Sequence, residues 1–220
     1  TALNMEKTCI DLGNAVRHAK QKLGYRHVVL LGWSGGGSLS AFYQSQAENP
    51  TVTCSPCGAG PDLTKQDFIP ADGLILMAAH ISRHGTLTQW IDASITDETD
   101  PERRDPALDL YSADIEPPYT QTFLESYRTA QIERNRKITA WVKHKLQELA
   151  DKGRENEEFA FVTHGTMADP RWLDPAVDPN DRKPGWCYLG EPRIVNNGPV
   201  GLARFSTLRS WLSQWSYDDA

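Results

Sequence analysis

The stretch His27-Val28-Val29-Leu30-Leu31-Gly32-Trp33-Ser34-Gly35-Gly36-Gly37 is the segment of this 220-residue chain that decides its fold class. Residues 27–31 form an apolar, β-branched run without polar alternation, which is typical of a buried parallel strand covered on both faces. The glycines that follow indicate a tight turn, and residues 38–46 have the composition of a helix that ends before Asn49-Pro50. The stretch therefore predicts a strand, a sharp turn carrying Ser34, and a helix.

The segments on either side predict that this strand belongs to a parallel α/β sheet. Over residues 5–23 the apolar positions recur at steps of three and four, which indicates an amphipathic helix, and Gly24 suits its C-terminal cap. Residues 73–79 give a second apolar run of strand length. Two buried strands joined through a helix favour parallel pairing.

The second half of the chain has a different character. Residues 96–105 are acidic and precede Pro106, which predicts an exposed connection. A helical stripe extends over residues 120–152, and its polar stretch at 133–137 marks a candidate break into two helices. Three further predictions complete this half: an extended segment at 159–162, a loop at 168–185 and a closing amphipathic helix at 208–215.

Composition excludes several classes of partner. The formal net charge is −6, so a basic face for nucleic acid is not expected. No apolar run approaches the roughly 20 residues that span a bilayer, and no basic-then-apolar leader opens the chain, so no membrane partner is expected. We expect a cytoplasmic protein, although the opening residues lack an initiator Met.

The four cysteines are too few and too scattered for a disulfide scaffold in a chain of this size. Cys54-Ser55-Pro56-Cys57 has the spacing of a redox motif, but it lies in loop composition rather than at a strand-to-helix junction. The role of Cys54 and Cys57 is left open. Because no further ligands are nearby, no metal site is predicted, and no cofactor is expected.

The segment Gly32-Trp33-Ser34-Gly35-Gly36 matches the Gly-x-Ser-x-Gly pattern of a nucleophile elbow, directly after a strand and directly before a helix. Such a strained turn needs residues without a Cβ at Gly32 and at Gly35 or Gly36, where neighbouring backbone passes closely. We therefore expect Gly36→Val to damage folding or activity. The alternative is a phosphate-binding turn, but neither the dinucleotide-binding nor the Walker pattern fits these residues.

On these residues the chain resembles the α/β-hydrolase superfamily, with specificity over about residues 1–95. The resemblance implies an α/β fold whose parallel sheet carries a large, mostly helical cap insertion. Residues 1–95 would be part of the core, and residues 96–220 the cap or lid region with its return helix. It implies that Ser34 is the nucleophile and that the Gly35 N–H is one donor to the oxyanion.

The same resemblance implies strands before residue 5, and late strands that carry an acid and a histidine. Since the sequence offers neither, we expect an interior portion of a longer hydrolase, whose remaining segments would be its partners. The second oxyanion donor would also lie outside this chain. The oligomeric state is left open.

The histidines are judged by their place in the predicted sheet. His80 and His84 leave the carboxyl end of the second strand, where open α/β sheets bind ligands, so together with Trp33 they are candidate substrate contacts. His144 lies on a solvated helix face, and His164 is the fallback base, with Asp105, Asp109 or Asp114 as its acid. None follows a late strand, so we expect no histidine of this chain within hydrogen-bonding reach of Ser34.

The expected activity is hydrolysis of a carboxylic ester through an acyl-enzyme at Ser34, with a small-molecule acyl substrate. Two alternatives stay open. One is another activity of the same fold, such as a peptidase, a C–C hydrolase or an acyltransferase. The other is a catalytically silent binding protein that keeps the turn but lacks its partners.

Overall fold

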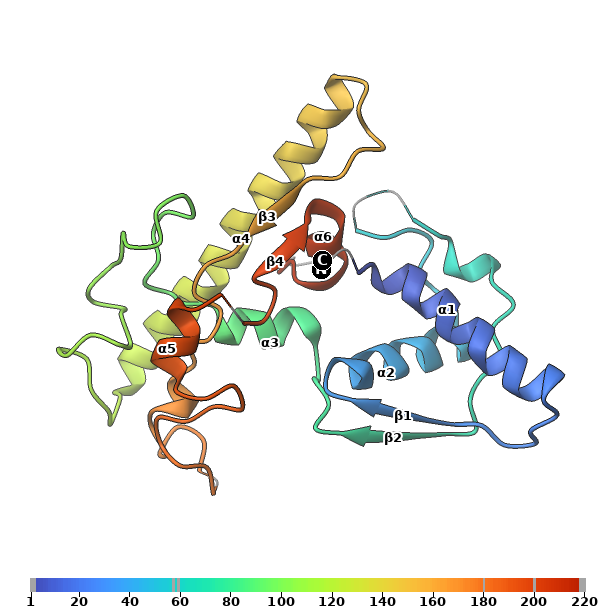
Figure 1. Ribbon diagram of the computed structural model, residues 1–220, viewed down its shortest axis with the longest axis horizontal. Coiled ribbons are helices and arrows are strands. Elements are labelled where there is room, and N and C mark those ends of the chain that lie inside the picture. The colour runs from blue at the N-terminus through green and yellow to red at the C-terminus, as the bar shows by residue number, and fades with distance from the viewer. Residues whose placement is uncertain (1–2, 57, 59, 180, 200, 218–220) are drawn as a thin grey trace. The chain divides into compact units, whose positions relative to one another are not determined.

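The computed structural model describes residues 3–56, 58, 60–179, 181–199 and 201–217, and combines helices with two small sheets (Figure 1). It divides into two compact units, which are described separately: an elbow unit, residues 3–86 and 209–215, and a helical unit, residues 87–208 and 216–217. The elements, in chain order, are α1 (Met5–Arg17), η1 (His18–Lys22), β1 (Val29–Trp33), α2 (Gly35–Glu48), η2 (Leu63–Lys65), β2 (Gly73–Met77), α3 (Arg83–Trp90), α4 (Gln121–Asp151), β3 (Ala160–Val162), η3 (Pro170–Trp172), α5 (Pro192–Asn197), β4 (Phe205–Thr207) and α6 (Leu208–Gln214).

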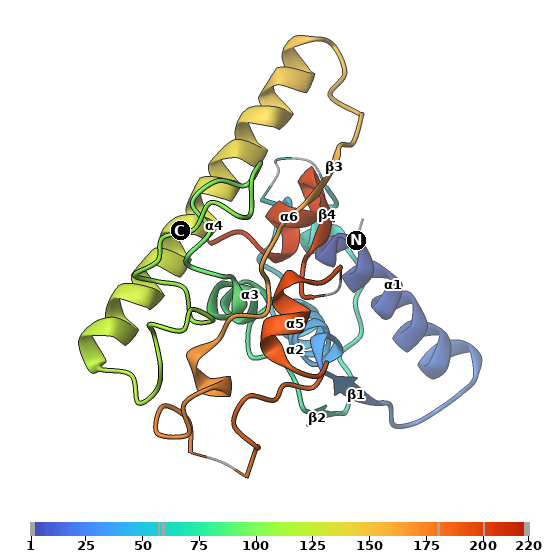
Figure 2. The same cartoon turned by 60° about the vertical axis from the view of Figure 1, so that its left-hand side comes forward.

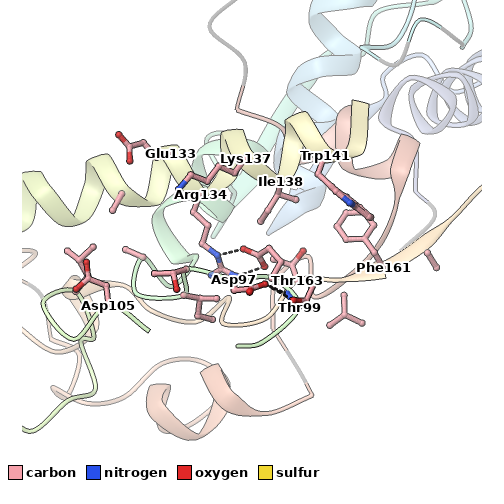
Figure 3. Close-up of a pocket in the computed structure, with 18 of the residues that line it drawn as sticks. Asp97, Thr99, Asp105, Glu133, Arg134, Lys137, Ile138, Trp141, Phe161 and Thr163 are labelled. Atoms are coloured by element: carbon pink, nitrogen blue, oxygen red, sulfur yellow. Dashed lines mark hydrogen bonds and ion pairs between the residues drawn. The ribbon is translucent and has the colours of Figure 1, made fainter. Parts of the chain in front are cut away.

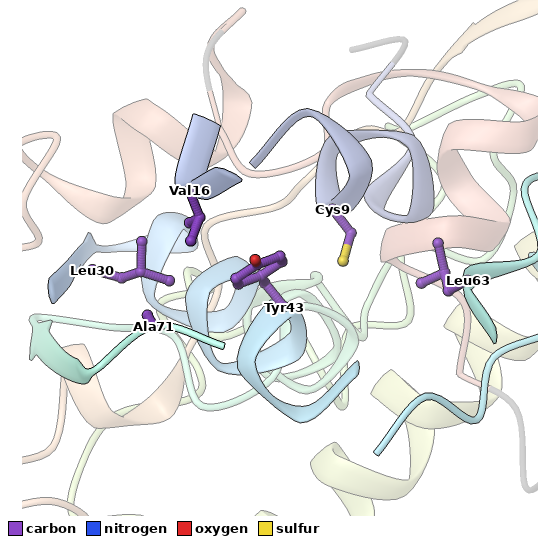
Figure 4. Close-up of a cluster of buried hydrophobic side chains, with 6 residues drawn as sticks. All are labelled: Cys9, Val16, Leu30, Tyr43, Leu63 and Ala71. Atoms are coloured by element: carbon purple, nitrogen blue, oxygen red, sulfur yellow. The ribbon is translucent and has the colours of Figure 1, made fainter. Parts of the chain in front are cut away.

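The elbow unit is built on the parallel pair β1 and β2, whose register extends from Val29 opposite Gly73 to Trp33 opposite Met77. The predicted parallel pairing is confirmed, and β1 continues two residues further than the predicted strand. Helices α1 and α2 lie on the same side of the two strands (Figure 1). Side chains from helices, strand and loops form one core between them (Figure 4), made of Cys9, Val16, Leu30, Tyr43, Leu63 and Ala71.

The other face of this sheet is apolar and exposed, which contradicts the prediction that both strands are buried on both faces. In β1, Leu30 is buried while Leu31 and Trp33 are 58% and 66% exposed. In β2, Ile75 and Met77, which lie opposite Leu31 and Trp33, are 51% and 50% exposed. The helices cover one face only, so within the described residues the sheet is a two-stranded ribbon and not a large α/β sheet.

The first helix follows the local signals of its sequence. The Asn4 side chain caps α1 by accepting a hydrogen bond of 3.0 Å from the backbone N–H of Lys7. The helix continues as one π-helical turn, η1, and the chain leaves it through Gly24, whose φ of 73° is left-handed. Because that conformation favours glycine, the predicted helix and its terminating glycine are both confirmed.

In the helical unit, α4 is one continuous helix of 31 residues, so the predicted break at 133–137 is wrong. Two polar residues of that stretch, Arg134 and Asn135, are buried and hydrogen-bonded to other segments of this unit. Arg134 donates to the carbonyls of Asp92 at 2.8 Å and His164 at 2.7 Å. Asn135 donates to the Thr88 hydroxyl at 2.9 Å. The polar side chains that suggested a break instead form hydrogen bonds that hold the segments around residues 88–92 and 164 against α4.

The chain after α4 turns back and returns along that helix into β3 (Figures 1 and 2). Strand β3 pairs antiparallel with β4, with Phe161 opposite Ser206, which confirms the predicted extended segment. The predicted loop at 168–185 is largely irregular, and among its described residues, 168–179 and 181–185, the short turn η3 is the only helical element. The predicted closing helix is α6.

Replacing Arg134 with methionine should lower the stability of the chain by at least about 2 kcal/mol, because the carbonyls of Asp92 and His164 would lose their buried donor. Its ion pair with Glu98 adds little, since that carboxylate is one-third exposed. Urea unfolding measures the effect. The matched control is Lys137→Met on the exposed side of the same helix, and equal unfolding midpoints for the two variants would contradict the assigned role.

Candidate functional site

Ser34 occupies the turn between β1 and α2 in a strained backbone conformation. Its φ of 52° and ψ of −124° lie where residues other than glycine rarely occur, at a cost of about 1–3 kcal/mol. Ser34 is also the N-cap residue of α2, yet its hydroxyl makes no capping hydrogen bond to that helix. A serine that caps a helix normally uses its hydroxyl in this way. The Ser34 hydroxyl is therefore available for another contact.

The strained turn is held by backbone hydrogen bonds to the end of the neighbouring strand. The N–H of Ser34 donates to the carbonyl of Met77 at 3.1 Å, and the N–H of His80 donates to the carbonyl of Ser34 at 3.0 Å. The N–H of Gly37 donates to the same Ser34 carbonyl at 3.0 Å. These bonds fix the serine against residues 77–80.

The Ser34 hydroxyl contacts the ring of His80, with 3.3 Å between Oγ and Nε2. The expectation that no histidine of this chain reaches Ser34 is therefore wrong. That expectation considered only histidines after a late strand. The carboxyl ends of adjacent parallel strands meet at one sheet edge, so a residue just beyond β2 lies beside the turn that follows β1.

The environment of His80 favours its neutral form. The ring is about half buried, and this burial lowers the pKa of His80 below its ordinary value of about 6.5. The positive charge of Arg83 lowers the pKa of His80 further. A neutral imidazole at neutral pH can accept the proton of a serine hydroxyl, as a general base requires.

The glycines of the turn differ in how tightly they are packed. A Cβ at Gly32 would lie 2.6 Å from the Gly36 carbonyl oxygen, and one at Gly37 would overlap the side chain of Ala79. A Cβ at Gly36 would meet nothing within 4 Å. The prediction that Gly32 is crowded is confirmed, whereas the prediction of a crowded Gly36 is wrong. The close contact is made one residue later, at Gly37, where α2 packs against Ala79 just beyond the end of β2.

Gly35 is crowded for a different reason, which the sequence did not reveal. A guanidinium nitrogen of Arg83, Nη1, fills the space that a Cβ at Gly35 would need. Gly35 begins α2, so its N–H lies in the first turn, where the helix dipole favours negative charge. Arg83 thus brings a formal positive charge beside the predicted oxyanion donor. Its position three residues beyond His80, at the carboxyl edge of the sheet, was the available signal.

Trp33 and His84, the other two candidate substrate contacts, are both exposed. Trp33 is the last residue of β1 and is 66% exposed, directly before Ser34. His84 lies in the first turn of α3 and is exposed, with its Nδ1 atom 3.0 Å from the Ser82 hydroxyl. Their proposed contacts with substrate stay predictions.

The remaining histidines belong to the helical unit. His144 is 71% exposed and lies 3.2 Å from a carboxylate oxygen of Glu148, as expected for a solvated helix face. The His164 carbonyl accepts from Arg134, and its ring nitrogen Nδ1 lies 3.3 Å from Arg204. Of its candidate acids, Asp105 and Asp109 accept backbone N–H groups in their own loop, and Asp114 is exposed.

The cysteines give no sign of a redox or metal centre within the described residues. Cys9 and Cys187 are buried thiols, and Cys54 is exposed and free. Cys57 lies outside the described residues, so the spacing of Cys54 and Cys57 stays uninterpreted. In the described ranges, no cluster of three or more His, Cys, Asp or Glu residues is placed to hold a metal ion.

The helical unit contains a cavity of about 660 Å³ between α4, β3 and the segment 93–108 (Figure 3). Its apolar wall includes Trp141 and Phe161, whose ring centroids are 5.2 Å apart. Its polar wall includes the Arg134–Glu98 ion pair, at 2.6 Å. The cavity has the size and the mainly apolar wall typical of small-molecule sites, and it is described for this unit alone.

Comparison of the chain with protein-family models, with curated proteins and with solved structures finds no match. Across the part of the chain that the structure describes, no helix is both long enough and apolar enough to cross a membrane.

The packing of the turn predicts opposite effects for two neighbouring glycines. Gly36→Ala should raise stability by about 0.5–1 kcal/mol, because position 36 is helical and a Cβ there meets open space. Gly37→Ala should lower stability by about 1–3 kcal/mol, because its Cβ would overlap Ala79. Thermal or urea unfolding of the two variants decides, and the same sign for both would refute this account of the turn.

Proposed function

We propose that the chain carries the nucleophile of a serine hydrolase that cleaves a carboxylic ester through an acyl-enzyme at Ser34. One observation carries the proposal: the hydroxyl of a serine in a strained strand-to-helix turn is directed at a half-buried histidine, 3.3 Å away, and not at its own helix. A serine with a purely structural N-cap role would instead accept a hydrogen bond from a backbone N–H in the first turn of its own helix. The strain at Ser34 supports the same conclusion, because such conformations cluster at functional sites.

In the proposed reaction, Ser34 Oγ attacks the ester carbonyl as neutral His80 takes the hydroxyl proton. The C–O bond to the alcohol then breaks, and the alcohol leaves with the proton held by His80. Water attacks the resulting acyl-enzyme in the same manner and releases the acid. The Gly35 N–H, at the start of α2, would donate to the oxyanion of each tetrahedral intermediate.

We further propose that the elbow unit is part of an α/β-hydrolase sheet, with residues 1–95 as core and residues 96–220 as cap. Two observations support this. Both β1 and β2 have an edge unpaired among the described residues. The sheet face away from α1 and α2 is apolar and exposed, notably at Leu31, Trp33, Ile75 and Met77, and parallel sheets are ordinarily covered on both faces.

Two alternatives remain distinguishable by experiment. A peptidase, C–C hydrolase or acyltransferase of the same fold would use the same serine but a different acyl donor or acceptor. A silent binding protein would keep the turn with an unreactive serine. The pairing of Ser34 with a histidine of lowered pKa favours a reactive serine.

Ser34→Ala should abolish covalent labelling by a neutral alkyl fluorophosphonate and hydrolysis of a short p-nitrophenyl ester, with a loss of several orders of magnitude. Intact-mass spectrometry measures the labelling. Ser38→Ala, in the first turns of α2, is the matched control and should keep the reactive serine. Unmodified wild-type protein after long exposure would reject the hydrolase proposal.

The labelling rate should depend on pH through His80. Only the neutral ring accepts the Ser34 proton, so the rate should be near its maximum at pH 7 and fall as pH drops through the His80 pKa, below about 6.5. His80→Asn should slow labelling at least roughly 100-fold and remove this pH dependence. His18→Asn, on the exposed surface of η1, is the control. An unchanged pH profile in His80→Asn would exclude His80 as the base.

A further inference from the structure

The guanidinium of Arg83 lies beside the candidate nucleophile and has no acidic partner among the described residues. Its Nη1 atom packs against Gly35, the residue after Ser34, in space that any side chain at position 35 would occupy. Its positive charge also acts on His80 and lowers the pKa of that ring. The contact with Gly35 therefore places this charge next to the Ser34–His80 pair, and its effect on the His80 ring agrees with that position.

The contacts of Arg83 position the guanidinium without neutralising it. Nη2 donates to the amide oxygen of Gln214, and Cζ lies 4.5 Å from the ring centroid of Trp215, at the distance of a cation–π contact. Nε is buried and has no hydrogen-bond partner in the described residues. Burial lowers the pKa of Arg83, although an arginine remains charged at any physiological pH. The charge is thus fixed in place but not balanced.

Several other arginines of the chain that are partly or fully buried reach a carboxylate, although Arg17 and Arg204, like Arg83, have a buried Nε without a hydrogen-bond partner in the described residues. Four of them reach a carboxylate oxygen: Arg104 to Asp92 at 2.7 Å, Arg128 to Asp169 at 3.1 Å, Arg134 to Glu98 at 2.6 Å and Arg171 to Asp169 at 2.5 Å. These pairs follow the rule that a charge removed from water is paired. Where Arg83 approaches the candidate site, the amide of Gln214 takes the place that a carboxylate has beside these four arginines. An exchangeable anion would complete that pairing.

We propose that Arg83 binds a carboxylate of the substrate, so that the preferred ester carries a carboxylate a few bonds from its scissile carbonyl. This inference rests on the proposed function of Ser34 and names the substrate class of the same site. Arginine suits the task, since its planar fork binds a carboxylate through two parallel hydrogen bonds. The position beside Gly35 sets the separation, because the carbonyl must reach Ser34 while the carboxylate reaches the neighbouring guanidinium.

The test compares two fluorophosphonates of equal size, one ending in a 3-carboxypropyl group and one ending in a 3-carbamoylpropyl group. Both form a bond between Ser34 Oγ and phosphorus and release fluoride, so the second-order labelling rate reports the same step for each. We expect the carboxylate probe to react at least tenfold faster with the wild-type chain, as a charge-assisted hydrogen-bonded contact allows.

Two variants assign this preference to Arg83. Arg83→Gln should bring the ratio of the two labelling rates to about one; the ratio is the readout because Arg83 also acts on His80, which serves both probes alike. Gln214→Glu keeps the arginine and supplies the missing carboxylate from within the chain, so it should also reduce the preference even if Arg83→Gln folds poorly. Arg26→Gln, an equal charge change at the opposite end of β1, should retain the wild-type preference.

The outcomes separate this inference from the proposed function. Equal rates of the two probes with the wild-type chain would overturn the carboxylate assignment while leaving Ser34 a reactive nucleophile. An equal slowing of both probes by Arg83→Gln would overturn it as well, because Arg83 would then act on the reacting phosphoryl oxygen. If neither probe modifies Ser34, the proposed function fails, and the inference that rests on it fails too.

Discussion

The parallel pairing of β1 with β2 is the constraint on which the rest of the elbow unit depends. Its register brings Trp33 opposite Met77, so both strands end at the same edge. The backbone bonds from Ser34 to Met77 and from His80 to Ser34 extend that pairing beyond the strands and over-determine the strained turn. Strain of about 1–3 kcal/mol persists only where surrounding structure enforces it, and here the neighbouring strand end does so.

The same pairing explains why the glycines of the turn are unequal. Helix α2 must pass the end of β2 closely, and the point of contact is Gly37 against Ala79. Gly36 faces open space, and Gly35 faces the guanidinium of Arg83. The three consecutive glycines therefore differ in what they tolerate. Position 37 must be glycine because Ala79 packs against it, position 36 has room for a larger residue, and a side chain at position 35 would displace the guanidinium of Arg83.

Two arginines, one in each unit, use their charge in different ways. In the helical unit, Arg134 joins α4 to two connecting segments and is neutralised by Glu98, which is a structural use of arginine. In the elbow unit, Arg83 is held by an amide and an aromatic ring and keeps its charge unbalanced. A balanced charge mainly organises the chain, whereas an unbalanced charge beside Ser34 is what the proposed carboxylate would pair with.

The sequence by itself determined the local elements around Ser34. Apolar runs, a capping asparagine and the glycines at positions 24 and 32 specify helix, strand and turn within a few residues, because propensity and steric freedom act locally. The edge location of His80 also followed from strand order, since parallel strands share a carboxyl edge. Only the tertiary structure decided that His80 reaches Ser34, that Gly37 rather than Gly36 is crowded, and that Arg83 packs on Gly35. Each of these contacts joins residues that are more than 40 positions apart in the sequence. The distance between the two residues depends on strand register and helix packing, which no local pattern encodes.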